Sequence, residues 1–277
     1  MPQIINTNIM SLMAQRNLNT TQGQLQTALE RLSSGLRINS AKDDAAGFYT
    51  SQLMTQDING MNQSIRNAND GVSLAQTGGA AMSEITNDLQ RLNELAVQSA
   101  NGTVQDRSGL QSEADQLTQE ISQIVQTSKF AGVHLLNSSA SVTFQVGQDG
   151  SASNQISVNG IDLTGLNSYS ASLTATGRVD ISSASAASAA ISSIQGDIKS
   201  VAKDAATFGA IQNRFQAVIS NLTSAAQSLT SARSRITDAN FASETAKLSR
   251  AQILQQAGVS MVAQANQQPQ VALALLR

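Results

Sequence analysis

Apolar residues recur at alternating steps of three and four along most of the chain, a spacing typical of helices that pack through a heptad seam. The longest such run predicts a single helix over residues 191–236. Two earlier runs predict helices over residues 58–96 and 110–128, with Asn101 and Gly102 as the turn between them. Long packed helices are therefore the dominant element of the predicted fold.

The same spacing is fainter toward the two ends of the chain. Leucines recur every seven residues from Leu18 to Leu32, and a weak repeat runs over residues 248–265. Residues 1–29 carry a single charge, and residues 251–276 carry none. Helices made amphipathic by Gln, Asn and Ser can bury against similar surfaces without removing ions from water. One chain has too little material to cover both arms, so we expect their apolar stripes to be interaction surfaces.

Between the helical arms the apolar pattern changes from heptads to alternation. Residues 142–146 alternate apolar and polar side chains, and residues 156–158 resume that alternation, with Asp149 and Gly150 as turn residues between them. This pattern predicts one β-hairpin. Residues 165–190 are rich in Ser, Ala and Thr, which is consistent with a surface loop, a linker or the start of a helix.

Composition narrows the class of protein. Aromatic residues make up 3% of the chain and Trp is absent, which favours narrow helix–helix seams and an elongated molecule over a wide aromatic core. A net charge of -2 gives no broad basic face for nucleic acid. The absence of Cys excludes disulfides, thiol catalysis and thiolate metal sites. No apolar run approaches the ~18 residues of a spanning helix, so we expect no membrane insertion.

Few residues are candidates for chemistry. His134 is the only histidine, so the pair of histidines that a zinc protease needs cannot form. Asp43 and Asp44 are adjacent, and adjacent side chains diverge on a helix, so we expect them to cap or to form structural hydrogen bonds. Gly78 and Gly79 lie within a heptad run, where close packing or a kink explains them. We therefore expect no catalytic residue, cofactor or metal site.

Specific strings are more informative than periodicity. They are IINTNIMSLMAQRNL (4–18), LERLSSGLRINSAKDDAAG (29–47), SIRNANDGVSLAQT (64–77), LQRLNELAVQSANGT (89–103), KFAGVHLL (129–136) and RITDANFASETAKLSRAQILQQAGVSMVAQANQQPQ (235–270). Their sequences and their order closely resemble bacterial flagellin, and they cover well over half of the chain.

The resemblance implies a mainly α fold, an elongated bundle of long antiparallel coiled-coil helices with one small β-hairpin, whose terminal helices pair in the assembled filament. The divisions it implies are an N-terminal arm (1–40) and a C-terminal arm (237–277) of an inner core domain, a helical rod (41–138) and a returning helix (191–236) of an outer core domain, and a hairpin with a Ser/Ala-rich segment (139–190). That last segment is short, so the large outer domains of longer flagellins should be missing.

The implied function is that of a structural subunit, not an enzyme, which polymerises into the extracellular bacterial flagellar filament for swimming. Unfolded export by the flagellar type III system is implied as well. The implied partners are further copies of the chain, a secretion chaperone on the C-terminal arm, the filament cap and the hook–filament junction proteins. The alternative is a hook–filament junction protein, whose ends are similar to those of flagellin.

Two sets of residues follow from the resemblance. Recognition by the animal Toll-like receptor for flagellin is implied for Gln90, Arg91, Glu94 and Leu95 on one helix and for Glu113 on the next. Self-assembly is expected of apolar residues in the two arms, namely Ile4, Ile5, Leu12, Leu18, Leu25, Leu254, Val259, Val262, Leu273, Leu275 and Leu276.

Overall fold

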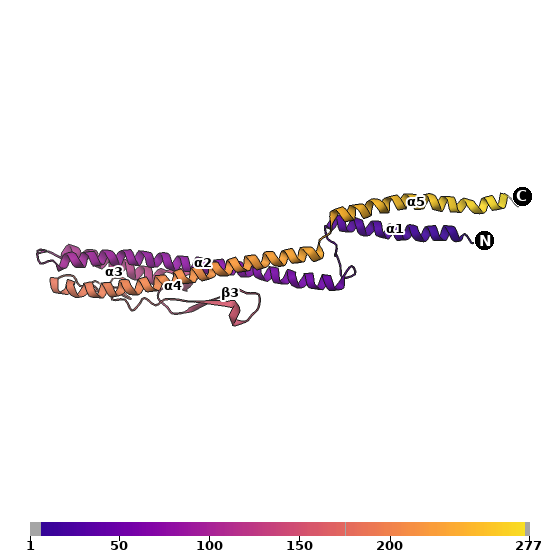
Figure 1. Ribbon diagram of the computed structural model, residues 1–277. Helices are drawn as coiled ribbons and strands as arrows, with labels where there is room; N and C mark the ends of the chain where they lie inside the picture. The colour runs from indigo at the N-terminus through magenta and orange to yellow at the C-terminus, as the bar shows by residue number, and fades with distance from the viewer. Residues whose placement is uncertain (1–6, 175, 275–277) are drawn as a thin grey trace. The chain divides into compact units, whose positions relative to one another are not determined.

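A computed structural model describes residues 7–174 and 176–274 (Figure 1). Most of these residues lie in the helices α1 (Ile9–Ser34), α2 (Ala45–Ala100), α3 (Ser108–Thr127), α4 (Ala184–Thr237) and α5 (Phe241–Ala274). The strands are β1 (Lys129–Phe130), β2 (Val133–His134), β3 (Ser141–Gln145) and β4 (Gln155–Asn159), with a 3-10 turn at Ala152–Asn154. The expected class, mainly α with long helices and a small hairpin, is confirmed.

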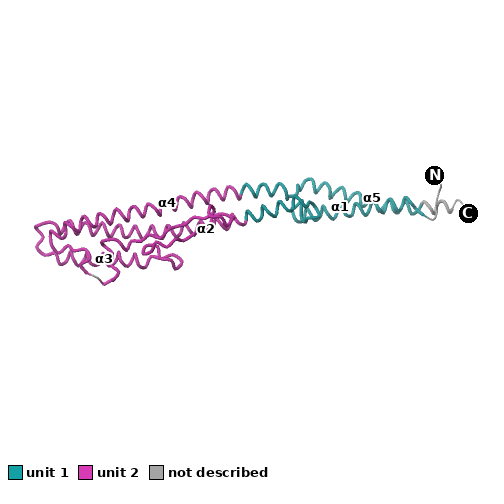
Figure 2. The backbone as a smooth tube through the Cα atoms, turned by 90° about the horizontal axis from the view of Figure 1, so that it is seen from below, with its two compact units in different colours: residues 1–58, 227–277 teal, residues 59–226 magenta. Residues whose placement is uncertain are grey.

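The chain divides into two compact units (Figure 2). Unit 1 consists of residues 1–58 and 227–277, and unit 2 of residues 59–226. The finer five-part division expected from the sequence stays a prediction.

Two helices begin earlier than their heptads indicate, because polar caps precede them. Asp44 caps α2: its Oδ1 accepts a hydrogen bond from the backbone N–H of Gly47 at 2.9 Å, and its carbonyl accepts one from Phe48 at 2.9 Å. Ser183 caps α4, since its Oγ accepts a hydrogen bond from the backbone N–H of Ala186 at 3.2 Å. Capping is therefore the role of Asp44. The last residues of the Ser/Ala-rich stretch form the first turns of α4.

In unit 1, α1 and α5 pair antiparallel. Asn8 caps α1 by accepting a hydrogen bond from the backbone N–H of Ser11, and Gly35 ends the helix with a φ of 72°, a conformation that favours glycine. The following loop binds the end of α4, because the N–H of Arg37 donates to the carbonyl of Thr237 at 2.6 Å. The carbonyl of Gly35 in turn accepts from the N–H of Ala239 at 2.9 Å.

Asp43 orders the loop between α1 and α2. Its Oδ2 accepts hydrogen bonds from the backbone N–H of Asn39 at 3.2 Å, and from the backbone N–H and the hydroxyl of Ser40 at 3.0 and 3.1 Å. These bonds, those from Ser40 above all, lower the pKa of the Asp43 carboxyl, and the charge of Arg31 adds to the effect. The expectation of structural hydrogen bonding at Asp43 is thus confirmed.

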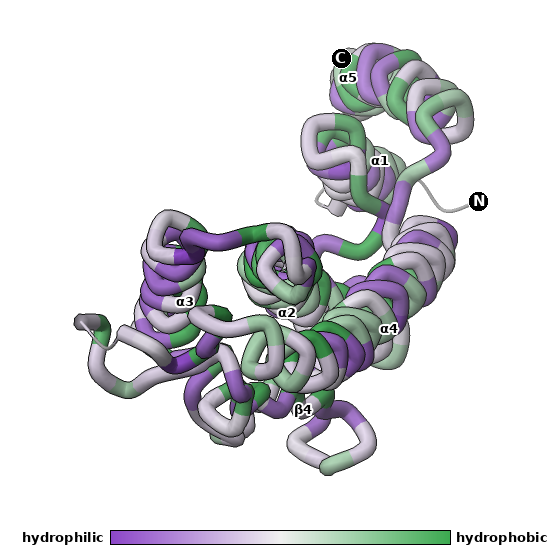
Figure 3. Tube along the Cα trace, turned by 90° about the vertical axis from the view of Figure 1, so that its left-hand side faces the viewer, coloured by the Kyte–Doolittle hydropathy of each residue, from purple (hydrophilic) through white to green (hydrophobic). Residues whose placement is uncertain are grey.

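In unit 2, α2 packs against both α3 and α4, and Figure 3 shows α2 between them. Gly78 of α2 lies against the ring of Phe208 of α4, and Gly71 lies against that of Phe215. Close packing is therefore the role of Gly78, whereas an added Cβ at Gly79 would meet nothing within 4 Å.

The expected hairpin is formed by β3 and β4, which pair antiparallel with Val142 opposite Val158 and Phe144 opposite Ile156. The ring of Phe144 contacts that of Phe215 edge to face, with centroids 5.4 Å apart. A second strand pair, β1 with β2, is formed by two residues in each strand and was not expected. Its turn is made by Ala131 and Gly132, both at positive φ.

Two polar clamps fasten the segment between β4 and α4. Asp197 of α4 is 3% exposed and accepts four hydrogen bonds, from the backbone N–H and the side chain of Asn167 and of Ser168, at 2.8 to 3.1 Å. Gln111 of α3 accepts from the N–H of Ile181 at 2.8 Å and donates to the carbonyl of Val179 at 3.0 Å. The carboxylate is therefore buried with its hydrogen-bonding capacity used.

Candidate functional site

One face of each terminal helix is used within the chain. The seam between α1 and α5 is formed by buried or half-buried residues at heptad spacing, namely Ser11, Ala14, Leu18, Thr21, Leu25 and Ala28 on α1 and Leu248, Ala251, Gln255, Gly258, Val262 and Ala265 on α5. The weak repeat expected over residues 248–265 is thereby confirmed. Gly258 permits close approach, because a Cβ added there would lie 3.1 Å from Cδ1 of Leu18.

Neutral polar groups join the two helices near the chain ends. Asn8 Nδ2 donates to the carbonyl of Ala265 at 2.6 Å, and the hydroxyl of Ser11 lies 2.8 Å from Oδ1 of Asn266. Ser11 is buried. This end of the pair is therefore held without burying an ion, as the charge-poor composition predicts.

The opposite end of the seam is charged. Glu244 of α5 is 5% exposed, and its Oε1 lies 2.8 Å from Lys247 Nζ and 3.5 Å from Arg31 Nη1. Arg250 lies beside them along the same groove. Within the part of the chain that the structure describes, Nε of Arg31 is buried without a hydrogen-bond partner.

The other faces of α1 and α5 expose many large apolar side chains. Ten such residues are between 47% and 66% exposed, namely Ile9, Met10, Leu12, Met13, Leu29, Phe241, Ile253, Leu254, Val259 and Met261. We call these ten residues together the outer apolar face; on α5 they lie on both flanks of the seam, with Leu254 on one side and Val259 on the other. Isolated apolar side chains are common on protein surfaces, but so many on two paired helices are typical of an interaction surface.

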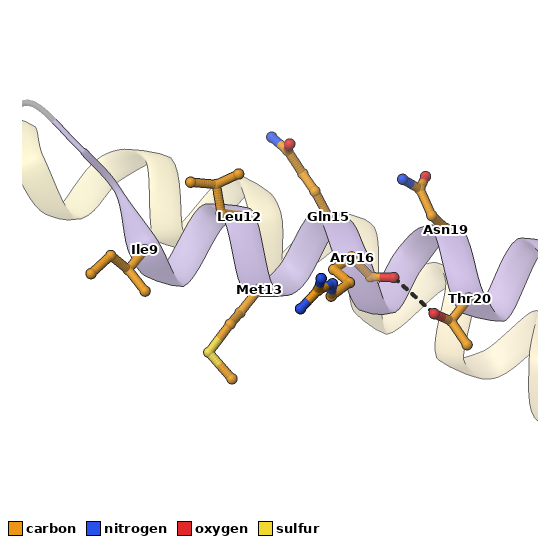
Figure 4. A pocket seen from close by; sticks show the side chains of 7 residues that line it. All are labelled: Ile9, Leu12, Met13, Gln15, Arg16, Asn19 and Thr20. Atoms are coloured by element: carbon orange, nitrogen blue, oxygen red, sulfur yellow. Dashed lines mark hydrogen bonds between the residues drawn. The ribbon is translucent and has the colours of Figure 1, made fainter.

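Two grooves run along this face. The first, which we call the α1 groove, is lined from α1 alone by Ile9, Leu12, Met13, Gln15, Arg16, Asn19 and Thr20 (Figure 4). Figure 4 shows these side chains projecting from α1, and the hydroxyl of Thr20 donates to the carbonyl of Arg16 at 3.0 Å. Arg16 is the one charged residue in the lining.

The second groove is formed by both helices, and we call it the shared groove. Its lining contains no charged residue and consists of Met10, Met13, Ala14, Asn17, Leu18, Thr21, Leu254, Ala257, Gly258 and Met261. Gly258 has no side chain and Leu18 lies against it, so the floor of the groove is apolar. The shared groove can accept an apolar helix face, and it offers no charged group to a polar ligand.

The structure separates the residues expected to carry self-assembly into two groups. Leu18, Leu25 and Val262 lie in the seam within the chain, whereas Leu12, Leu254 and Val259 belong to the outer apolar face. Leu273 lies in α5, and Ile4, Ile5, Leu275 and Leu276 lie outside the described residues. Met10, Met13 and Met261 were not expected from the sequence to take part, although their positions flank the seam.

The residues expected to bind a receptor lie on α2 and α3. Arg91 links the two helices: its Nη2 lies 2.7 Å from Oε1 of Glu113, and its Nη1 lies 3.1 Å from Oε2 of Glu94. These bonds, the one to Glu113 first, raise the pKa of the guanidinium of Arg91, which is already charged at any physiological pH. Gln90, Arg91, Glu94 and Glu113 are exposed.

Leu95 differs from its neighbours. It is 1% exposed and belongs to the core of unit 2, although Arg91 precedes it by one helical turn. A receptor that binds this surface cannot contact Leu95 without unpacking it. Leu95 is buried because α2 packs against two helices, which buries a wider stripe of α2 than a single seam would.

The remaining candidates for chemistry have structural positions. His134 is exposed on β2, and its Nδ1 lies 3.4 Å from Nδ2 of Asn137. No group of three or more metal-binding side chains occurs among residues 7–174 and 176–274. No helix in that part of the chain is long and apolar enough to cross a membrane.

Two family models match the chain. The bacterial flagellin N-terminal helical region matches residues 5–141, and the bacterial flagellin C-terminal helical region matches residues 191–276. Between them lie residues 142–190, a segment that contains β4 and that Asp197 and Gln111, from the two matched regions, hold by hydrogen bonds.

Several flagellins align with this chain over almost its full length. A flagellin of Halalkalibacterium halodurans is 42% identical over 277 residues, which cover 99% of this chain and all of that protein. A flagellin of Serratia marcescens is 38% identical over 351 residues and is also aligned throughout. Flagellin B of Vibrio cholerae is 33% identical over 371 residues, which cover 98% of this chain and 99% of that protein. The crystal structure of Bacillus cereus flagellin matches with a TM-score of 0.49 and 30% identity, over 57% of this chain and 88% of that one.

The longer alignments to the Serratia and Vibrio proteins show that those relatives contain additional sequence, so this chain is a short form without large outer domains. The N-terminal match contains α1, α2 and α3, and the C-terminal match contains most of α4 and all of α5. The chain belongs to the bacterial flagellin family and is a structural subunit of the extracellular flagellar filament.

Proposed function

We propose that the outer apolar face of α1 and α5 is the surface through which one copy of this subunit binds another. The observation that carries the proposal is the division of each helix into two faces. One face is used in the seam within the chain, and the other exposes ten large apolar side chains.

A second copy of the chain is the occupant that fits this face best. The family forms a homopolymeric filament, so identical surfaces meet in many copies. The shared groove contains no charge that would select a charged partner. Burial of side chains that are about half exposed stabilises such a contact by roughly 25 cal/mol for each Å² of apolar surface removed from water.

Polymerisation of purified monomers on filament seeds tests this proposal. Leu254→Asn places a polar group in the shared groove at a position that is 47% exposed, so the monomer should keep its helical content and lose most of its polymerisation. The matched control is Leu173→Asn, which changes a 39% exposed leucine in the segment before α4. Filaments that grow at the wild-type rate from Leu254→Asn would show that the shared groove is not a contact.

The same surface suits the export route that we propose, in which the chain leaves the cell unfolded through the flagellar type III system. Exposed apolar side chains on the monomer would associate prematurely unless a partner covers them before assembly. We propose that a secretion chaperone binds the C-terminal arm at α5 and covers them. Contacts with the filament cap and with the hook–filament junction proteins belong to the same proposal. Crosslinking at Leu254 and Val259 in cell extracts, with mass spectrometry of the captured partners, tests it.

A second proposed role is recognition by the animal Toll-like receptor for flagellin. The observation that favours it is the exposed cluster of Arg91, Glu94 and Glu113, which presents one guanidinium held by two carboxylates across α2 and α3. Preordered charged side chains of this kind are common anchors in protein interfaces. Gln90 lies next to Arg91 on α2 and is also exposed.

A further inference from the structure

Among residues 7–174 and 176–274, the accessible sulfur atoms are concentrated on the outer apolar face. Met10, Met13 and Met261 are 62%, 61% and 59% exposed, and all three line the shared groove. The other methionines of the described part of the chain are shielded: Met54 and Met61 are half-buried and Met82 is 0% exposed.

We propose that Met10, Met13 and Met261 form an oxidation site, at which a peroxide converts the exposed thioethers to sulfoxides and thereby prevents a free subunit from assembling. This inference rests on the proposed function, because oxidation can block assembly only if the shared groove is a contact between copies. It goes beyond that function by assigning the same groove a chemical switch with a defined substrate class, the peroxides.

The reaction needs no catalyst from the protein. The thioether sulfur attacks one oxygen of hydrogen peroxide, an S–O bond forms, and the O–O bond breaks. The departing hydroxide takes up the remaining proton and leaves as water, so sulfur is oxidised to the sulfoxide while the peroxide is reduced. Susceptibility to oxidation follows solvent exposure, which singles out these three among the methionines that the structure describes.

The groove has little capacity to accommodate the products. A sulfoxide is polar and needs a hydrogen-bond donor when a partner covers it. The polar side chains in the lining are Asn17 and Thr21, and the hydroxyl of Thr21 already donates to the carbonyl of Asn17 at 2.9 Å. Three sulfoxide oxygens would therefore be buried with fewer donors than they require.

The first experiment treats the full-length monomer with hydrogen peroxide and maps the sulfoxides by mass spectrometry over time. Met10, Met13 and Met261 should be oxidised at least about tenfold faster than Met82, because exposure controls access. Oxidation of Met82 at the same rate would overturn the assignment of the site.

The second experiment compares two variants in seeded polymerisation before and after peroxide. The triple variant Met10→Leu, Met13→Leu, Met261→Leu keeps the apolar volume and should polymerise equally with and without peroxide. The control Met54→Leu, Met61→Leu removes other thioethers and should lose polymerisation as the wild type does, by at least about tenfold. Equal loss in the triple variant would overturn the proposal.

Reversal gives an independent readout. Oxidised wild-type monomers incubated with both methionine sulfoxide reductases and a dithiol should regain polymerisation, because these enzymes act on the two sulfoxide epimers. Sulfoxides that are reduced, as shown by mass, without recovery of polymerisation would contradict the proposal.

Preformed filaments separate a failure of this inference from a failure of the proposed function. If the shared groove is a contact, the three methionines should be oxidised at least about tenfold more slowly in filaments than in monomers. Equal rates would mean that assembly leaves the groove open, which refutes the proposed function. Protection in filaments combined with normal polymerisation of oxidised monomers would refute only the oxidation site.

Discussion

Gly78 of α2 lies directly against the ring of Phe208 of α4, and a Cβ built on Gly78 would come within 2.6 Å of the Cζ atom of that ring. Atoms that approach so closely must move, and the neighbour here is a rigid ring that is 1% exposed in the core. The absence of a side chain at Gly78 is therefore a condition for the packing of α2 on α4.

Gly78→Ala should destabilise the protein by about 1–3 kcal/mol, the range typical of overpacking in a core. Gly79→Ala is the matched control in the same turn, since an added Cβ there would meet nothing within 4 Å. We expect that control to be neutral or stabilising by about 0.5–1 kcal/mol, because alanine favours the helix. Urea unfolding followed by circular dichroism measures both, and a Gly78→Ala variant as stable as the control would contradict the packing argument.

Asp197→Ala should cost about 2–4 kcal/mol, because it leaves the buried N–H group of Ser168 and the N–H group of Asn167 without their acceptor. The partly exposed Asp204 lies two turns further along the same helix, and Asp204→Ala should change the free energy of unfolding by less than about 0.5 kcal/mol. Asp197→Asn keeps one acceptor and should fall between the two. Hydrogen exchange at Ser168 reports the clamp directly, and unchanged protection in Asp197→Ala would disprove its role.

Asp88 gives a prediction about pH. Burial raises the pKa of its carboxyl above the ordinary value of 3.8, and the charges of Glu120 and Glu84 add to the effect. Its Oδ2 is buried and has no hydrogen-bond partner in the described part of the chain. The folded state therefore favours the protonated form, so the stability from Asp88 is present below pH 3.8 and is lost as the pH rises through the raised pKa.

Asp88→Asn mimics the neutral form and should therefore stabilise the protein at about pH 7 and have little effect near pH 3. Urea unfolding of the variant and of the wild type at the two pH values gives the difference in their free energies of unfolding. The contributions of the other carboxyls cancel in that difference. A difference that does not change with pH would show that ionisation of Asp88 in the folded state carries no penalty.

Arg91 and Leu95 should separate binding from folding, although they are one turn apart. Arg91→Ala removes exposed ion pairs, so it should change the free energy of unfolding by less than about 1 kcal/mol. Leu95→Ala removes a core side chain and should cost about 2–5 kcal/mol. If the proposed receptor surface is real, Arg91→Ala should weaken receptor signalling by the folded monomer, and unchanged signalling would refute that surface.

The heptad spacing was sufficient to predict the long helices and the repeat positions of α5, but not that α1 would cover those positions within the same chain. It predicted these positions because burial between two helices repeats at three and four residues, as at Ala251 and Gly258. It could not predict the burial of Leu95, since a helix with two neighbours buries two overlapping stripes. The strands β1 and β2 were missed because two residues, as in Lys129–Phe130, are too few for alternation to be recognised.

The sequence predicted that the two terminal arms form the candidate site, but it did not predict which of their apolar residues are exposed. The lack of charge identified both arms, which reflects the cost of burying ions. Leu18 and Leu12 have the same chemistry, and only their phase relative to the seam places one inside the chain and the other on the outer apolar face. The polar caps at Asp44 and Ser183 explain why α2 and α4 begin before their first apolar repeat.

Gly71 and Gly78 of α2 are seven residues apart, and so are Phe215 and Phe208, the two rings of α4 that lie against them. A heptad pattern by itself tolerates sliding, because moving one helix by seven residues again places apolar side chains opposite each other. Here such a slip would keep Gly78 opposite a ring, now that of Phe215, but would place Phe208 against the buried Ile85, where no space exists for it. The spacing of Gly71 and Gly78 thus disfavours this slip of α2 along α4, which the heptad repeat alone would permit.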